Sequence, residues 1–378
     1  MEALELLKNL VSINSVFPNE RELAEYLELH LIELGFSIKR VPIAEGRFNL
    51  IAERGTHGKP IGFYGHMDTV PPYGEWKKNP TEPWEDGDKL YGLGASDMKS
   101  GLAAIIKACG CETERKIKIA FGADEENISE GAFAILKSGF FSDCEGIMVT
   151  EAGESDKGPL GSKMITLGRR GHVICEITVP GKSSHGAHVS LGTNAINEAA
   201  RFVLALEKMK LPENTVFPPA TQFVRSFKAE NTSLSIPDFA IIELDRHTIP
   251  PETSESVLKE IKQFIDSLYA SGEFRETESK RITVKLKERK TPYLDPYVTN
   301  KEHPFVKKLA TAILDYHKSE PVFNCGSSVA DENVFARSGL PVVTVGVIGG
   351  NEHSANEWVS KQSYFDLIEV LSRFIKIE

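Results

Sequence analysis

The chain has 378 residues, of which 41% are hydrophobic and 26% are charged, and its formal net charge is −10. This length and composition are typical of a globular protein with roughly two domains and a large core. The negative charge argues against a nucleic-acid partner, which would require a basic surface patch. No segment approaches the roughly 20 apolar residues that span a bilayer, so we expect no membrane partner.

The first residues, 2–13, are charged and amphipathic, and they lack the basic head and unbroken apolar run of a signal peptide. The cysteines are odd in number and scattered, with no second pair to complete a zinc ribbon. We therefore expect free thiols in a reducing compartment and a cytoplasmic location. The five cysteines are Cys109, Cys111, Cys144, Cys175 and Cys325.

Helical spacing of apolar residues predicts a first helix over residues 2–13. A second helix is expected to begin at Asn19, whose side chain can cap it, with Glu22 completing a capping box and Gly35 ending it. Strand-like runs then alternate with helices, which predicts a mainly parallel sheet covered on both faces. The predicted strands are 36–43, 49–53, 60–65, 116–122, 146–150 and 341–347, and the helices are 98–108 and 131–138.

The middle third has a different pattern, with strands over 173–179, 221–227, 239–245 and 281–286 and helices over 194–209 and 255–269. This βαββαβ order is typical of a small ferredoxin-like sandwich. The predicted fold is therefore an α/β domain, formed by residues 1–171 and 288–378, with an inserted α+β domain over residues 172–287.

Acids and histidines follow several predicted strands: His66 with Asp68, the run 124–126, Glu151, and Glu352 with His353, while Asp97 opens a helix. Ligands collect at the carboxyl ends of parallel strands, so these distant residues can meet in one cleft. Imidazole and carboxylate groups are good ligands for zinc, cobalt or manganese, and two cations would balance so many acids. Taken alone, each of these residues could have a purely structural role, such as a hydrogen-bonded core histidine or a helix cap.

Seven segments occur in one order: GHMDTVP, GASDMKSGLAA, ADEE, TEAG, GKSSHGAH, LGTNAI and NEHSANEWV. Together they resemble the metallopeptidase family of acetylornithine deacetylase, succinyl-diaminopimelate desuccinylase and the glutamate carboxypeptidases, over nearly the whole chain. The resemblance implies a catalytic domain with two divalent metal ions, zinc above all, and an inserted lid domain that also makes a homodimer. It also implies an amide-bond hydrolase.

The resemblance assigns roles to individual residues. Asp97 would bridge both ions, His66 and Glu151 would bind one ion, and Glu126 and His353 would bind the other. Asp68 would orient the imidazole of His66, and Glu125 would act as general base on a metal-activated water and return the proton to the leaving nitrogen. In the inserted domain, His185 resembles a histidine that reaches the substrate carbonyl. Arg246, Ser327 and Ser328 resemble groups that bind a substrate carboxylate.

The leading hypothesis is a metal-dependent deacylase that removes an acetyl or succinyl group from an N-acyl amino acid. A carboxypeptidase or dipeptidase acting on a short peptide is the alternative within the same class. A non-catalytic dimeric relative that binds metal or ligand is a second alternative, against which the retention of Glu125 argues. A glycosidase with paired acids is a third, but it leaves His66 and His353 unexplained.

Overall fold

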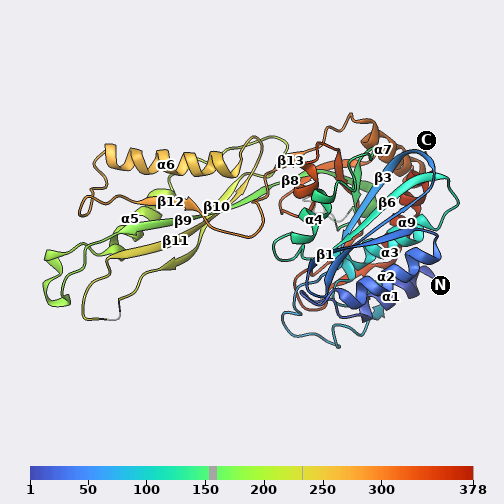
Figure 1. The fold of residues 1–378 in the computed structure, drawn as a ribbon, viewed down its shortest axis with the longest axis horizontal. Helices are drawn as coiled ribbons and strands as arrows, with labels where there is room; N and C mark the ends of the chain where they lie inside the picture. Colours follow the sequence, from blue (N-terminus) through green and yellow to red (C-terminus); the bar gives the residue numbers. More distant parts are fainter. Residues whose placement is uncertain (153–159, 232, 378) are drawn as a thin grey trace. The chain divides into compact units, whose positions relative to one another are not determined.

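The computed structural model describes residues 1–152, 160–231 and 233–377 (Figure 1). The chain forms two compact units: unit 1 comprises Met1–Arg169 and Val298–Glu378, and unit 2 comprises Arg170–Tyr297. Unit 2 is thus one continuous segment inserted into unit 1. Among the described helices, none combines the length and apolar character needed to cross a bilayer.

The insertion ends ten residues beyond the predicted boundary at Lys287, because the following residues stay attached to unit 2. The single proton of the Tyr293 hydroxyl is shared between the main-chain oxygens of Lys287, at 2.7 Å, and Ile174, at 3.0 Å. The main-chain N–H of His172 also donates to Leu294 O, at 2.8 Å. These contacts are tertiary, so the local pattern around Lys287 did not indicate them.

A large mixed sheet forms the centre of unit 1, with the strand order β1-β2-β6-β3-β7-β15-β8-β13 and with β14 beside β8. The neighbours β6, β3, β7 and β15 run parallel, which confirms the predicted mainly parallel core of the sheet. The strands are β1 (Ser37–Ala44), β2 (Arg47–Arg54), β3 (His57–His66), β6 (Arg115–Gly122), β7 (Ile147–Val149), β8 (Met164–Arg169), β13 (Tyr297–Val298), β14 (Val322–Gly326) and β15 (Val342–Thr344).

Helices cover this sheet (Figure 1). The helices α1, α3, α9 and α7 pack successively against one another, and α4 packs against α8. The second helix does not begin as predicted: Glu20 precedes it without a side-chain cap, and Asn19 Nδ2 instead donates to Val16 O at 3.1 Å. The helices are α1 (Ala3–Ser12), α2 (Arg21–Glu33), α3 (Ser100–Cys109), α4 (Glu130–Ser138), α7 (Pro304–His317), α8 (Glu332–Ala336) and α9 (Lys361–Lys376), with short turns η1 (Ala95–Lys99) and η2 (Gly161–Lys163).

A second, small sheet of unit 1 has the order β16-β17-β5-β4. Its strands are β4 (Trp84–Asp86), β5 (Lys89–Tyr91), β16 (Gly349–Gly350) and β17 (Trp358–Ser360). Because β16 pairs with β17, the segment between them, residues 351–357, is held as a closed loop. That loop carries His353.

Unit 2 contains an antiparallel sheet of order β10-β11-β9-β12, and its elements follow the βαββαβ order along the chain. Alternate side chains of β9 and β11 are buried in a core shared with α5 and α6, as the period of two along a strand requires. The elements are β9 (Gly171–Pro180), η3 (Gly186–Leu191), α5 (Ala195–Leu206), β10 (Thr221–Lys228), β11 (Phe239–Thr248), α6 (Ser254–Ala270) and β12 (Thr283–Leu286).

Candidate metal centre

The register of the parallel strands brings three of the predicted segments to one edge of the sheet. His66, the last residue of β3, lies opposite Gly122, the last residue of β6. Tyr64 of β3 lies opposite Val149, the last residue of β7. The chain therefore leaves β3, β6 and β7 at the same edge, where residues 66–68, 124–126 and 151 follow.

Asp97 is supplied by η1, and a buried glutamate fixes its position. The carboxylate of Glu357 accepts three main-chain hydrogen bonds, from Gly94 at 2.8 Å and from Ser96 and Asp97 at 2.9 Å each. Burial and the nearby charge of Asp97 raise the pKa of Glu357 to about 8, although the N–H donors oppose this shift. Glu357 thus holds the backbone that presents Asp97.

Two histidines meet the carboxylate of Asp97, one at each oxygen. His66 Nε2 lies 3.0 Å from Asp97 Oδ1, and His353 Nε2 lies 3.3 Å from Oδ2. His353 Nε2 also lies 3.1 Å from Glu126 Oε2. Asp97, Glu126 and His353 each offer a ligand atom within 4.8 Å of the others. A carboxylate with one imidazole at each oxygen suits a ligand that bridges two cations.

Glu151 lies in the same acidic environment, but its carboxylate contacts an arginine. Arg169 Nη2 lies 3.0 Å from Glu151 Oε2, and the same guanidinium binds Glu332 at 2.8 Å and the hydroxyl of Ser328 at 2.7 Å. Burial raises the pKa of Glu151 to about 8; Arg169 opposes this shift, and the charges of Glu332 and Asp97 add to it. Sequence reasoning missed Arg169, because nothing in the local pattern marks it.

Asp68 acts on this site through a different atom from the one expected. The Nδ1 atom of His66 lies 3.0 Å from the main-chain oxygen of Asp68 but 3.8 Å from its carboxylate. The carboxylate instead accepts hydrogen bonds from the main-chain N–H groups of Glu125, at 3.2 Å, and Glu126, at 2.9 Å. Asp68 therefore orients the His66 ring through its backbone, and it holds the turn that carries both glutamates through its side chain.

The pKa of Glu125, at this edge of the sheet, is raised by its surroundings. Burial raises the pKa of Glu125 well above its ordinary value; His66 opposes this shift, and the charges of Glu126, Asp331 and Glu151 add to it. A carboxyl group with a raised pKa is a stronger base than a solvated one, and it can also release the proton later as an acid. The carboxylate of Asp331 in turn accepts a hydrogen bond from Tyr64.

The same acids favour the charged form of His66 and His353. Hydrogen bonds to Asp97 and Glu126 raise the pKa of His353 to about 10. Burial lowers the pKa of His66, but Asp97 and the charges of Glu125 and Asp68 outweigh it and raise the value well above the ordinary one. The Nε2 protons of His66 and His353 would then point at carboxylate oxygens, in positions that metal cations could take instead. Metal binding to such donors displaces protons.

The predicted substrate-binding residues have the following surroundings. His185, in unit 2, is exposed, and its Nδ1 accepts a hydrogen bond from the N–H of Ala187 at 3.1 Å. Arg246, also in unit 2, is 1% exposed and pairs with Glu252 and, at 2.7 Å, with Glu260. Ser327 and Ser328 follow β14 in unit 1, where Ser328 binds Arg169. Their contacts to substrate stay predictions.

The fold and the centre together define a metal-dependent hydrolase. The profile of peptidase family M20/M25/M40 matches residues 62–377, so the chain belongs to this family. The chain is a hydrolase that acts on amide or peptide bonds. Membership of this family removes the alternative of a glycosidase.

Relatives agree with this assignment over nearly the full length. The chain is 26% identical over 365 residues to a succinyl-diaminopimelate desuccinylase of Buchnera aphidicola, covering 94% of this chain and 93% of that one. Its fold is similar to a tripeptidase from Staphylococcus aureus, with a TM-score of 0.80, 21% identity and coverage of 99% and 97%. It is also similar to a dinuclear metal-binding peptidase from Bacillus subtilis, with a TM-score of 0.74, 17% identity and coverage of 99% and 96%.

Proposed function

We propose that this chain removes an acetyl or succinyl group from an N-acyl amino acid, with Glu125 as the proton-transferring base. The observation that carries this proposal is the half-buried carboxylate of Glu125, whose main-chain N–H is held by Asp68 beside the proposed ligands His66 and Glu126. The desuccinylase relative supports the choice of acyl group.

The donor set fits two divalent cations, with zinc first and cobalt or manganese as alternatives. Asp97 would bridge them, His66 and Glu151 would hold one, and Glu126 and His353 would hold the other. When bound, the ions supply Lewis acidity and lower the pKa of water. Glu125 accepts the proton of the attacking water and delivers it to the departing nitrogen, which leaves as an amine.

Residues outside the centre complete the proposal. His185 would donate a hydrogen bond to the substrate carbonyl as negative charge develops on it. Arg246, Ser327 and Ser328 would bind the substrate carboxylate; for Arg246 this requires release from Glu252 and Glu260. Unit 2 would serve as lid and homodimer contact. The cytoplasmic location stays a prediction.

A peptidase activity on short peptides is the second candidate, and the likeness to the tripeptidase favours it. The two candidates differ in the acyl pocket, whereas the metal centre is common to both. A comparison of kcat/KM for N-succinyl and N-acetyl amino acids with that for di- and tripeptides, using zinc-loaded protein, distinguishes them. A peptide preferred over every acyl amino acid would overturn the deacylase proposal and leave the metal centre intact.

The role of Glu125 is tested by the substitution Glu125→Gln, which keeps the shape of the side chain and removes its basicity. We expect kcat to fall by about 10²- to 10⁴-fold while the metal content is unchanged. The matched control is Glu53→Gln, at an exposed position of β2, which should keep full activity. Hydrolysis undiminished in Glu125→Gln would contradict the mechanism, and metal binding without turnover of any substrate by wild type would favour a non-catalytic relative.

A further inference from the structure

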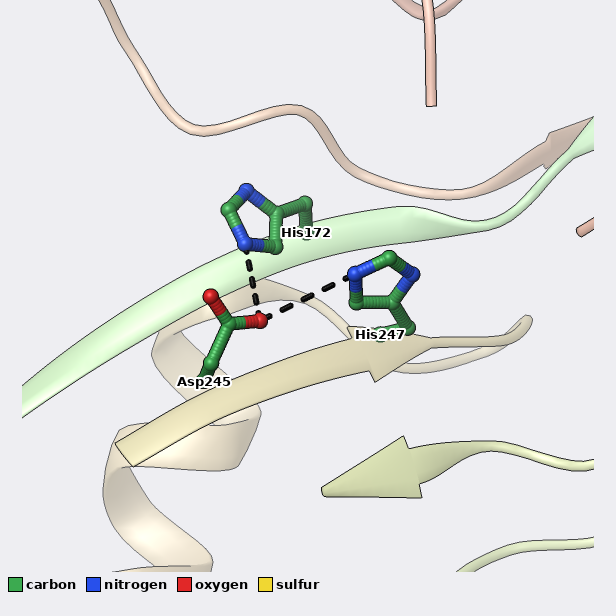
Figure 2. Close-up of side chains that lie close together, drawn as sticks. All are labelled: His172, Asp245 and His247. Atoms are coloured by element: carbon green, nitrogen blue, oxygen red, sulfur yellow. Dashed lines mark hydrogen bonds and ion pairs between the residues drawn. The ribbon is translucent and has the colours of Figure 1, made fainter. Parts of the chain in front are cut away.

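A second group of metal-ligand side chains lies in unit 2, on the sheet face opposite the core. His172 of β9 and His247 of β11 are direct cross-strand partners, and Asp245 lies two residues before His247. Because side chains alternate along a strand, His247 and Asp245 point to the same face, and the register adds His172 to them. Figure 2 shows the three side chains gathered above the two strands.

The ring nitrogens of both histidines converge on one carboxylate oxygen. His172 Nε2 lies 2.9 Å from Asp245 Oδ1, and His247 Nε2 lies 3.7 Å from the same atom (Figure 2). The ligand atoms of the three residues all lie within 4.8 Å of one another. A tetrahedral zinc ion with bonds of about 2.0–2.1 Å holds its ligand atoms about 3.3 Å apart. The two measured separations lie on either side of that distance.

We propose that unit 2 binds one divalent transition-metal ion, of the zinc type, through His172, Asp245 and His247. Two imidazoles and one carboxylate form a ligand set that zinc accepts, and water completes the coordination. The proposal does not depend on the metal centre of unit 1, with which it shares no residue.

The two carboxylate oxygens of Asp245 have different partners: Oδ1 faces the two histidines, and Oδ2 faces Arg225. Arg225 Nη1 lies 3.6 Å from Asp245 Oδ2, on the other side of the carboxylate from Oδ1. The neighbouring acid, Glu243, pairs with Lys287 at 2.6 Å and with Arg225 at 3.5 Å. The arginine is 42% exposed, so it can move as a cation approaches. Arg225 and Lys287 thus offset part of the negative charge of Asp245 and Glu243.

The site is also accessible and firmly built. Asp245 is buried, whereas the side chains of His172 and His247 are 21% and 30% exposed, which gives an ion and its water ligand access from solvent. All three residues belong to paired strands, and sites on strands hold ligand geometry better than sites on loops. An ion there would join β9 to β11 close to Arg170, where unit 2 begins.

Zinc stoichiometry of the full-length protein tests this site. After equilibrium dialysis against ZnCl₂ and elemental analysis, we expect His247→Gln to bind one zinc fewer per chain than wild type. The matched control is His57→Gln, at an exposed histidine of unit 1, which should bind as much as wild type. The same loss should appear in an Asp97→Asn/His353→Gln background, which separates this site from the centre of unit 1.

A structural measurement covers the case in which a variant folds poorly. Crystals of wild type soaked in ZnCl₂ should give an anomalous peak bonded to His172 Nε2, His247 Nε2 and Asp245. An unchanged zinc content in a folded His247→Gln protein would overturn the proposal. A map with zinc peaks in unit 1 and no peak at these three side chains would overturn it as well.

Discussion

Asp68 acts on the centre in two ways: its main-chain oxygen contacts the ring of His66, and its side chain holds the turn that follows β6. Its carboxylate accepts hydrogen bonds from the N–H groups of both Glu125 and Glu126, so it fixes the position of the proposed base, Glu125, relative to the proposed ligand, Glu126. An asparagine there would turn an N–H₂ group toward one of the two donors. The resulting mismatch would move the base.

We therefore expect Asp68→Asn to lower kcat by about 10- to 100-fold, as for other groups that orient metal ligands. The metal content should change less than the activity, because His66 is oriented by the main-chain oxygen of residue 68. Steady-state kinetics and elemental analysis of the same preparation measure both quantities. Asp86→Asn, at an exposed position of β4, is the control; equal activity of the two variants would refute the role of Asp68.

Protonation of His66 and His353, the proposed metal ligands, should make metal affinity depend on pH. The pKa of His353 is raised to about 10 and that of His66 is raised above its ordinary value, so the surrounding acids favour the doubly protonated, cationic form of both rings in the metal-free protein. A cation has to displace these protons, and it competes less well at lower pH. Affinity should therefore rise with pH until the pH passes about 10, the pKa of His353.

Calorimetric titration of metal-free protein with zinc, at pH 7 in buffers of different ionisation enthalpy, counts the protons released. We expect a net release on binding, reduced in His353→Gln. Proton uptake, or an affinity that falls between pH 6 and pH 8, would contradict the protonated state of these rings.

At the scale of secondary-structure elements, the turn η1 that presents Asp97 is hydrogen-bonded to a glutamate from a loop distant in sequence. Glu357 accepts N–H groups from residues 94, 96 and 97, which lie about 260 positions away in the chain. Glu357→Gln would place an amide N–H₂ against N–H donors. The free energy of unfolding should fall by about 1–3 kcal/mol, the usual result of leaving buried donors unpaired.

Metal affinity should fall together with stability in Glu357→Gln, since Asp97 would lose its fixed position. Thermal unfolding and zinc titration measure the two effects, and Glu320→Gln, at an exposed position, serves as control. A variant with weakened stability and unchanged zinc affinity would show that Glu357 is not needed to position Asp97.

The elements also show what the sequence could predict. His66, Glu126 and Glu151 follow buried strands whose apolar runs are readable, and parallel pairing brings such strand ends together. Glu357 and Arg169 were not predicted, because each depends on partners brought close only by the tertiary fold. The strands of the small sheet are two or three residues long, too short for a period to be visible.

At the scale of the whole molecule, unit 2 has a hydrophobic core of its own. Unit 2 contains a hydrophobic core built from its own sheet and helices, and it is one continuous segment. We expect the fragment Arg170–Tyr297, expressed alone, to fold and to unfold in one cooperative transition. Far-UV circular dichroism and calorimetry test this expectation.

The same fragment with Ile261→Ala provides the matched comparison, because this side chain is fully buried in the core of unit 2. Its unfolding free energy should be lower by about 2–5 kcal/mol, as for other large-to-small core substitutions. A fragment without any cooperative transition would show that unit 2 needs unit 1 in order to fold.

The chain leaves unit 1 after β8 and returns to it at β13, which is the neighbour of β8 in the large sheet. Beside them, the N–H of Thr299 donates to Leu167 O at 2.7 Å. The two severed ends of unit 1 would consequently stand next to each other if unit 2 were removed, and a tight turn of a few residues could join them. A protein shortened in this way would keep every proposed metal ligand. The junction between β8 and β13 is therefore a position where one inserted domain could be replaced by another.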